Sequence, residues 1–266
     1  MLIAETSDEG RSLAVTKTPF TWTLATDLDR RQRKLLQNPE HLELLQKWDI
    51  VSRCRFGAFR YDQRFEAYSS NAKGDLAFLQ SLFDSSAFRQ QFNGLVPNGY
   101  YVQNVERVPA SVVSMNIFNV FRKFGAVYGK DTIAICPEVF LDNGIICENQ
   151  VKRCLFDEDH EGYGELDHRE FIVQLMEMMV LGGPFCQYED EFQMYADVVK
   201  AFYKSLMSVV KDADESIRVT STIYRIRDAE LFPEAPTSSW NRCYVIIDSA
   251  LRQATFLYMP RSDRPW

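Results

Sequence analysis

Histidine is scarce and cysteine is scattered in this chain of 266 residues, which has three histidines and six cysteines. No two cysteines form a CxxC pair, although zinc sites usually take two ligands that lie close together in the sequence. We therefore expect no zinc site. The cysteines are expected to be mostly buried thiols of a reducing compartment. They are Cys54, Cys136, Cys147, Cys154, Cys186 and Cys243.

Positive charge and long apolar runs are also lacking. Thirty Lys and Arg residues stand against 37 Asp and Glu residues, so the net charge is −7, whereas a stand-alone nucleic-acid binder needs a basic field. No apolar run approaches the roughly 18 residues of a membrane helix. The first nine residues carry acids where a signal peptide has basic and apolar regions. These features predict a cytosolic protein with no nucleic-acid or membrane partner.

The familiar catalytic and phosphate-binding motifs are missing as well. The sequence contains no GxSxG, P-loop, GxGxxG or HExxH motif. Cys186 could form a dyad with a histidine, and Asp62 with Glu66 could act as general acid and base. A buried thiol and exposed carboxylates are the commoner arrangements for such residues. We therefore predict no catalytic residues and no cofactor, with an uncharacterised enzyme as an alternative.

What is present is the composition of a globular protein, with 46% hydrophobic and 25% charged residues. Residues 169–181 and 191–210 carry apolar positions at helical spacing, which predicts two helices packed as a hairpin. Residues 217–226, 244–247 and 254–258 predict three successive strands with short links, typical of an antiparallel meander. Because helices and strands are segregated, the predicted class is α+β, with helical hairpins packed with a mainly antiparallel sheet.

Other patterns predict earlier elements and the domain boundary. Alternation predicts strands over 19–24 and 100–105, and an apolar run predicts a helix over 112–124. Residues 1–17 are polar and unpatterned, so we expect a flexible N-terminal tail. A single globular α+β domain is expected over 18–266.

The segment from Asp159 to Glu170 fits the frame of an EF-hand calcium loop. Asp159 takes position 1, Gly164 the sharp turn at position 6, and Glu170 the bidentate position 12. The ligands in between are poor, because Glu161 at position 3 is one methylene too long and Tyr163 at position 5 has no carboxylate. We predict no tight calcium site and keep Asp159, Glu161 and Glu170 as weak metal candidates. A calcium-responsive regulator remains an alternative function.

A glycine pair followed by proline predicts the turn between the two late helices. Gly182-Gly183 ends the first helix, and Pro184 prevents its continuation. The residues expected to be accessible at the turn are Gln187, Tyr188, Glu189 and Asp190. Either they contact a protein partner, or Tyr188 packs inward and the acids cap the next helix. Both interpretations are open.

Four blocks of sequence carry a resemblance to a known family. They are Asp-His-Arg-Glu-Phe at 167–171 with Leu-Gly-Gly-Pro-Phe-Cys-Gln-Tyr-Glu-Asp at 181–190, the aromatic-rich block 58–68, the block 219–224, and 244–248 with 257–258. In the order and spacing of these blocks, from about residue 20 to residue 258, the chain resembles cilia- and flagella-associated protein 300.

The resemblance implies a non-enzymatic protein-interaction factor for the assembly or transport of outer and inner axonemal dynein arms. It implies protein partners, namely cytoplasmic dynein-arm preassembly factors or axonemal dynein complexes. It also implies a location in the cytoplasm and in the axoneme of motile cilia and flagella. The departures fall mainly at residues 157–166, where the vertebrate form is longer and lacks the glycines, which weakens calcium binding as a family property.

Overall fold

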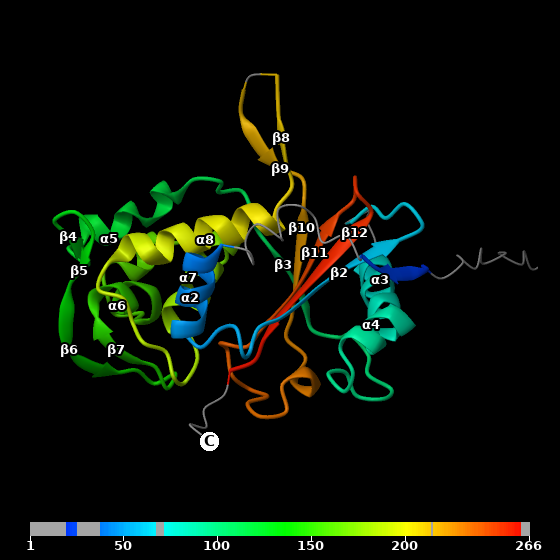
Figure 1. Cartoon of the computed structure of the whole chain (residues 1–266), viewed down its shortest axis with the longest axis horizontal. Helices are drawn as coiled ribbons and strands as arrows, with labels where there is room; N and C mark the ends of the chain where they lie inside the picture. The colour runs from blue at the N-terminus through cyan, green and yellow to red at the C-terminus, as the bar shows by residue number, and fades with distance from the viewer. Residues whose placement is uncertain (1–19, 26–37, 68–71, 214, 262–266) are drawn as a thin grey trace, which may run out of the picture.

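A six-stranded antiparallel sheet with helices on both faces lies at the centre of the structure (Figure 1). The structure, a computed structural model, describes residues 20–25, 38–67, 72–213 and 215–261. The α+β class with a mainly antiparallel sheet is confirmed. The tail expected at 1–17 lies outside the described residues.

The strands of this sheet follow the order β1-β2-β12-β11-β10-β3. Their bounds are β1 Trp22–Leu24, β2 Arg55–Tyr61, β3 Val105–Val108, β10 Thr222–Ile226, β11 Arg242–Asp248 and β12 Gln253–Met259. Tyr244 of β11 pairs with Arg225 on one side and with Leu257 on the other. The expected C-terminal meander is therefore confirmed as β10, β11 and β12.

Alternate residues of the central strands contribute to two separate cores, one on each face of the sheet. On β11, Tyr244 and Ile246 belong to the larger core, whereas Cys243 and Val245 belong to the smaller one. Successive side chains of a strand point to opposite faces. Because both faces of β11 are covered, its sequence is apolar almost throughout and shows little alternation of polarity.

Two helices cover the smaller core, α3 (Ala72–Asp84) and α4 (Ser86–Gln91). Phe83 of α3 meets Phe256 of β12 edge to face, with ring centroids 6.0 Å apart. Phe88 of α4 makes the same kind of contact with Phe256 at 5.0 Å. Aromatic packing of this geometry fixes both helices on the sheet.

The larger core contains the remaining helices. They are α2 Pro39–Lys47, α5 Val120–Lys123, α6 Gln150–Phe156, α7 Phe171–Leu181 and α8 Phe192–Leu206. Every residue of α7 is buried, whereas α8 buries one face. The two helices pack against each other, which confirms the expected hairpin. None of the helices in the described ranges is long and apolar enough to cross a bilayer.

Three two-stranded ribbons and three short 3-10 helices complete the described structure. The ribbons are β4 Val127–Tyr128 with β5 Thr132–Ile133, β6 Ile135–Phe140 with β7 Ile146–Asn149, and β8 Val209–Lys211 with β9 Ile217–Val219. The 3-10 helices are η1 Met115–Asn119, η2 Tyr163–Glu165 and η3 Ala229–Leu231.

The helix expected over 191–210 extends four residues too far at its C-terminal end, and the strand expected over 217–226 is interrupted. Helix α8 ends at Leu206, and Val209 pairs with Val219 in the β8–β9 ribbon. β-branched residues favour such pairing. The chain leaves the ribbon at Ser221, whose hydroxyl accepts a hydrogen bond from the Ser208 N–H at 2.8 Å.

The strand expected over 100–105 is wrong, because the polar groups of that segment donate hydrogen bonds to one buried carboxylate. Asp228 accepts hydrogen bonds from the Tyr100 hydroxyl at 2.7 Å and from the Asn104 N–H at 2.7 Å. The adjacent strand β3 begins only at Val105. The helix expected over 112–124 is likewise shorter, since it begins as η1 at Met115 and continues as α5.

Candidate protein-interaction surface

The connection from α7 to α8 runs along the C-terminal end of α2. Gly182 follows α7 with a backbone φ of 58°, a value that residues with a side chain rarely adopt. A Cβ atom on Gly183 would lie 2.3 Å from a carboxylate oxygen of Asp49. The Gly183 N–H donates to the Trp48 carbonyl at 2.9 Å. The predicted glycine stop is confirmed, and its physical cause is the close approach of these two segments.

Glu189 is an anchor of this connection and is only 7% exposed. Its Oε1 accepts a hydrogen bond from Trp48 Nε1 at 3.0 Å, and its Oε2 pairs with Lys47 Nζ at 2.8 Å. The Glu189 N–H donates to the Tyr195 hydroxyl at 3.1 Å. The Tyr195 ring stacks on the Trp48 ring. The expectation that Glu189 is accessible is therefore wrong, because its carboxylate satisfies a buried indole N–H.

Removing the Glu189 carboxylate should destabilise the fold, whereas the neighbouring acid should be dispensable. Glu189→Ala leaves the Trp48 indole N–H buried without an acceptor, so the free energy of unfolding should fall by about 1–3 kcal/mol. Asp190→Ala removes an exposed side chain and should change it by less than about 0.5 kcal/mol. Urea unfolding of the two variants measures the difference. Equal losses in both would contradict the anchoring role of Glu189.

Gln187, Tyr188 and Asp190 are exposed on the connection, so the alternative in which Tyr188 packs inward is wrong. The backbone is held on both sides of Tyr188. The Gln187 N–H donates to the Lys47 carbonyl at 2.9 Å, and the Asp190 carbonyl accepts from the N–H of Ile133 at 2.8 Å. A backbone held in this way has little freedom left to lose on binding. Contact of these three side chains with a partner stays a prediction.

An exposed apolar patch extends from Tyr188 onto the β6–β7 ribbon. Lys152 Nζ lies 3.5 Å from the centroid of the Tyr188 ring and 3.5 Å from the Ile146 carbonyl oxygen. Ile146 pairs across the ribbon with Phe140, and these two residues are 44% and 71% exposed. We name the exposed Phe140, Ile146 and Tyr188, together with the buried Lys152 that lies between the ribbon and Tyr188, the Tyr188 patch. Exposed apolar side chains that lie near one another are typical of protein-interaction sites.

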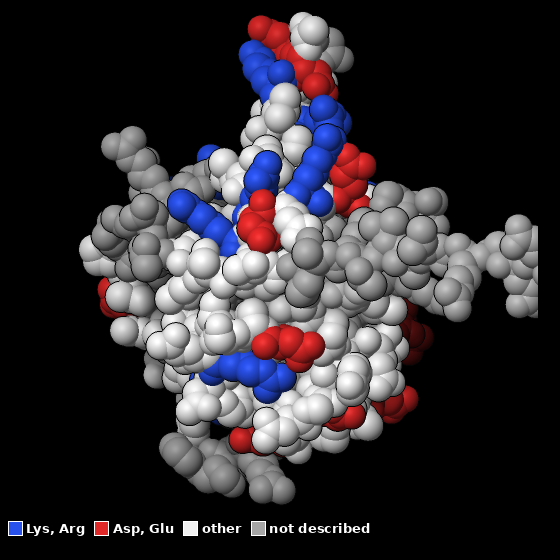
Figure 2. Space-filling view, turned by 90° about the vertical axis from the view of Figure 1, so that its right-hand side faces the viewer, with Lys and Arg blue, Asp and Glu red and all other residues white. Residues whose placement is uncertain are grey.

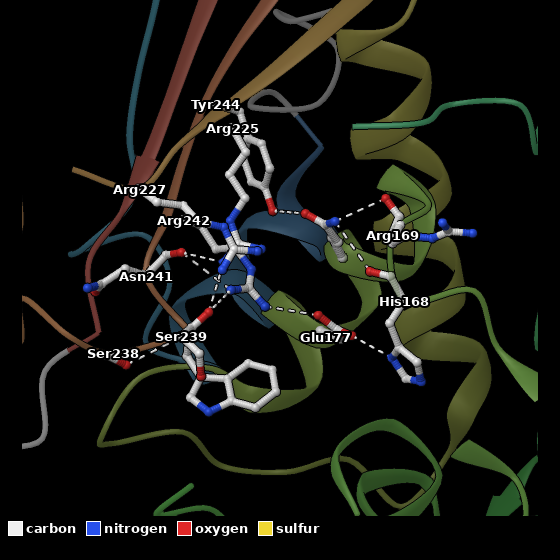
Figure 3. A network of polar contacts seen from close by, with 12 residues as sticks. His168, Arg169, Glu177, Arg225, Arg227, Ser238, Ser239, Asn241, Arg242 and Tyr244 are labelled. Carbon is white, nitrogen blue, oxygen red and sulfur yellow. Dashed lines mark hydrogen bonds and ion pairs between the residues drawn. The ribbon is translucent and has the colours of Figure 1, made fainter. Parts of the chain in front are cut away.

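A buried polar network fixes α7 against the sheet (Figure 3). Oε2 of Glu177 pairs with Arg242 at 2.9 Å, and its Oε1 lies 2.9 Å from His168 Nδ1. Gln174, one turn earlier on α7, accepts from the Tyr244 hydroxyl at 2.6 Å. Both oxygens of Glu177 are thus engaged by protein groups. The network positions the helix and leaves this carboxylate no free oxygen for general-base chemistry.

Arg225 adds a second buried cation to this network. Both Arg225 and Arg242 donate hydrogen bonds to the backbone carbonyls of Ser239 and Asn241. Burial, together with repulsion from Arg242, lowers the pKa of Arg225 to about 10, so it remains charged at neutral pH. Arg225 lies 3.7 Å from the partly exposed Glu106, whereas Arg242 pairs with the buried Glu177.

Four of the cysteine thiols are poor nucleophiles, because burial raises their pKa. Burial raises to about 12 the pKa of four cysteines, which are Cys54, Cys147, Cys154 and Cys186. Because the thiolate is the reactive species, these groups are unreactive at neutral pH. The pairing of Cys186 with a histidine, which the sequence left open, therefore lacks an activated thiol.

One cysteine–histidine contact has no signal in the sequence. Cys154 Sγ lies 3.6 Å from His160 Nδ1, and the Gly162 N–H donates to the same nitrogen at 3.0 Å. That nitrogen is an acceptor and carries no proton, and burial lowers the pKa of His160. The pair is therefore neutral and structural. Its spacing of six residues matches no motif that could have indicated it.

The two carboxylates considered as an acid–base pair are engaged separately. An Asp62 oxygen accepts from the Thr21 N–H at 3.0 Å, and this contact is the largest cause of a lowered Asp62 pKa. Glu66 pairs with Arg64. These contacts show the two groups in separate interactions, with no shared proton.

The structure does not bring the EF-hand candidates together. Asp159 and Glu161 are exposed on the loop, whereas Glu170 is buried. The Glu170 carboxylate accepts hydrogen bonds from Ser111 and from the Val112 N–H. Among the described residues, no three His, Cys, Asp or Glu side chains are grouped closely enough to hold a metal ion. The absence of a tight calcium site stays a prediction.

Comparison with known proteins identifies the family. The model of the family "Cilia- and flagella-associated protein 300" matches residues 22–259, which begin with the first residue of β1 and end with the last of β12. The chain belongs to this family. Its members of that name in Paramecium tetraurelia and Chlamydomonas reinhardtii are 29% and 27% identical over 234 and 237 residues. These alignments cover 84% and 80% of this chain and 88% of each relative.

Family membership confirms the resemblance seen in the sequence. No solved structure matches the chain. The family name associates the chain with cilia and flagella. The matched region contains every strand of the central sheet and both helices of the α7–α8 hairpin, so the connection that carries Tyr188 lies within the family region.

Proposed function

We propose that this protein is a non-enzymatic interaction factor for the assembly or transport of outer and inner dynein arms in motile cilia and flagella. Its partners are dynein-arm preassembly factors of the cytoplasm or axonemal dynein complexes, and it acts in the cytoplasm and the axoneme. The observation that carries the proposal is the family match over residues 22–259. It supports ciliary function for the whole sheet-and-helix unit.

The geometry supports interaction in preference to catalysis. The Tyr188 patch presents apolar and aromatic side chains from a fixed backbone, which suits binding to another protein. Groups that could react are instead held or deactivated by the protein: both oxygens of Glu177 have partners, and partial burial raises the pKa of the Cys186 thiol. We therefore place the function on the surface.

Loss of the gene in a motile ciliated cell should reduce the density of outer and inner dynein arms and leave cilium length nearly normal. Electron micrographs of axoneme cross-sections, together with beat frequency, measure this effect. Wild-type protein should restore the arms, and the tagged protein should be found in both cytoplasm and axoneme. Full-density arms in the null mutant would overturn the proposed function.

A patch variant tests whether the Tyr188 patch carries this function. Tyr188→Ser with Phe140→Ser should fold normally but restore fewer arms than wild type, because both side chains are exposed. Tyr101→Ser is the matched control, since Tyr101 is 68% exposed and lies outside the patch. Full rescue by the double variant, at wild-type protein level, would remove the patch from the proposal.

A further inference from the structure

The β8–β9 ribbon stands out from the body of the protein, as Figures 1 and 2 show. Its aliphatic residues are exposed, with Val209 at 49%, Val210 at 45% and Ile217 at 53%. A two-stranded ribbon buries little surface of its own and is only marginally stable alone. Exposed aliphatic side chains on such a ribbon are therefore candidates for contact with another molecule.

A groove of about 740 Å³ lies at the base of this ribbon, between it and α8. The groove is lined mainly by apolar side chains, which include Val113, Ala201, Met207, Val209 and Ile217. Its volume is in the range of sites that hold ligands in proteins. The N-terminal end of α2 forms another part of the wall through His41.

Two polar atoms in the lining have no hydrogen-bond partner among the described residues. They are the Tyr203 hydroxyl and His41 Nδ1, and both atoms are buried. Tyr203 is only 6% exposed, and burial raises the pKa of its hydroxyl, which therefore stays protonated and able to donate. Buried polar groups are nearly always satisfied in native structures. The Tyr203 hydroxyl oxygen is itself buried, so it lies behind the surface of the groove and is not open to a ligand there.

Helix α8 contributes two small side chains to the groove, the partly exposed Ala201 and the buried Ser205. Ala201 and Ser205 lie one turn apart and both line the groove. Their small side chains allow close approach, and helices pack by fitting such rows against each other. An amphipathic helix laid in an apolar groove is a common mode of protein recognition.

The charge of the groove indicates which kind of helix would bind there. Lys204 lines the groove, its side chain is exposed, and no acidic residue is among the described residues that line it. The charges on the ribbon are instead paired with each other, as Lys211 with Glu215 and Arg218 with Asp212. A ligand with a carboxylate beside its apolar face would complement Lys204.

We propose that the groove between α8 and the β8–β9 ribbon binds an amphipathic helix of a protein partner, with apolar side chains in the groove and an acidic residue at Lys204. This inference rests on the proposed role as an interaction factor and names one of its binding sites.

A random 16-residue peptide library displayed on phage, selected on the full chain, tests this proposal. Enriched peptides should carry apolar residues at i, i+3, i+4 and i+7 with at least one Asp or Glu. Fluorescence anisotropy of such a peptide should show binding that weakens by at least about tenfold in Val113→Glu or Ala201→Glu, which place a carboxylate in the groove. Lys204→Met should weaken it about two- to fivefold, less so at high salt.

Lys200→Met is the matched control, because Lys200 is exposed one turn earlier on α8 and does not line the groove. It should bind the peptide as wild type does. Three results would overturn the proposal: enrichment of basic peptides or of none, binding unchanged in the groove variants while their thermal unfolding is normal, and a wild-type dimer that Val113→Glu dissociates. The last would make a second copy the occupant. Each of these results can occur whether or not the null mutant loses dynein arms, so failure of this proposal is distinguishable from failure of the proposed function.

Peptide binding only after Leu35→Ser and Leu36→Ser would also overturn the proposal. These residues lie in the chain that directly precedes Asn38, which lines the groove. In that case the occupant would be a segment of the protein itself.

Discussion

Replacing Arg242 with methionine is expected to lower the free energy of unfolding by about 3–5 kcal/mol, because it leaves the buried Glu177 carboxylate without its cation. Arg242 is 3% exposed, and it joins strand β11 to helix α7 through this ion pair. Methionine has a similar length and is apolar, so the loss measures the missing charge more than a missing volume.

A double variant separates the buried charge from other effects. Arg242→Met with Glu177→Gln should recover part of the stability. The amide that replaces the Glu177 carboxylate is uncharged, so no unpaired charge remains in the core. Arg169→Met is the matched control, since the Arg169 side chain is 81% exposed in its pair with Asp167 and should matter little. Chemical unfolding measures all three. If the double variant were less stable than Arg242→Met, the buried-charge explanation would be wrong.

The sequence predicted those parts of the fold that depend on neighbours in the chain. The glycine pair at Gly182 ends a helix because its backbone conformation and close contacts exclude a side chain. The meander followed from short links, which let strands such as β11 and β12 pair with their successors. Both signals are local, and both are confirmed.

The errors arose where a distant residue decides the local structure, or where one apolar run fits two kinds of element. The segment before Val105 alternates like a strand, but its polar groups bind Asp228, more than 120 residues later. Val209 and Val210 continue the apolar pattern of α8, but they pair with Val219 and Arg218. The Asp228 contacts lie beyond any sequence window, whereas the β8–β9 pairing is local and was missed because its valines also fit the helical pattern.

The same limit applies to the candidate surfaces. The Gly-Gly-Pro turn predicted where Tyr188 lies, but Lys152 and Ile146, which extend its patch, come from another part of the chain. Glu189 looked like a surface acid because it lies between polar residues, and only the position of Trp48 shows why it is buried. Charge alone does not identify an exposed residue when a buried donor needs an acceptor.

The interior of the α7–α8 hairpin should be far more sensitive to truncation than its surface. Phe202 on α8 is 5% exposed and belongs to the same core as Phe171 and Leu175 of α7. Phe202→Ala should lower the free energy of unfolding by about 3–5 kcal/mol, because it removes a buried ring and leaves a cavity. Urea unfolding followed by circular dichroism measures the change.

Met194→Ala on the same helix is the control for this variant. Met194 is 38% exposed, so its truncation should cost less than about 1 kcal/mol, even though alanine replaces a large apolar side chain in both cases. Alanine favours helix at both positions, so a difference between the variants reports packing against α7. Similar losses in the two would mean that α8 is not held by its buried face. The hairpin would then not be the rigid support from which the connection presents Tyr188.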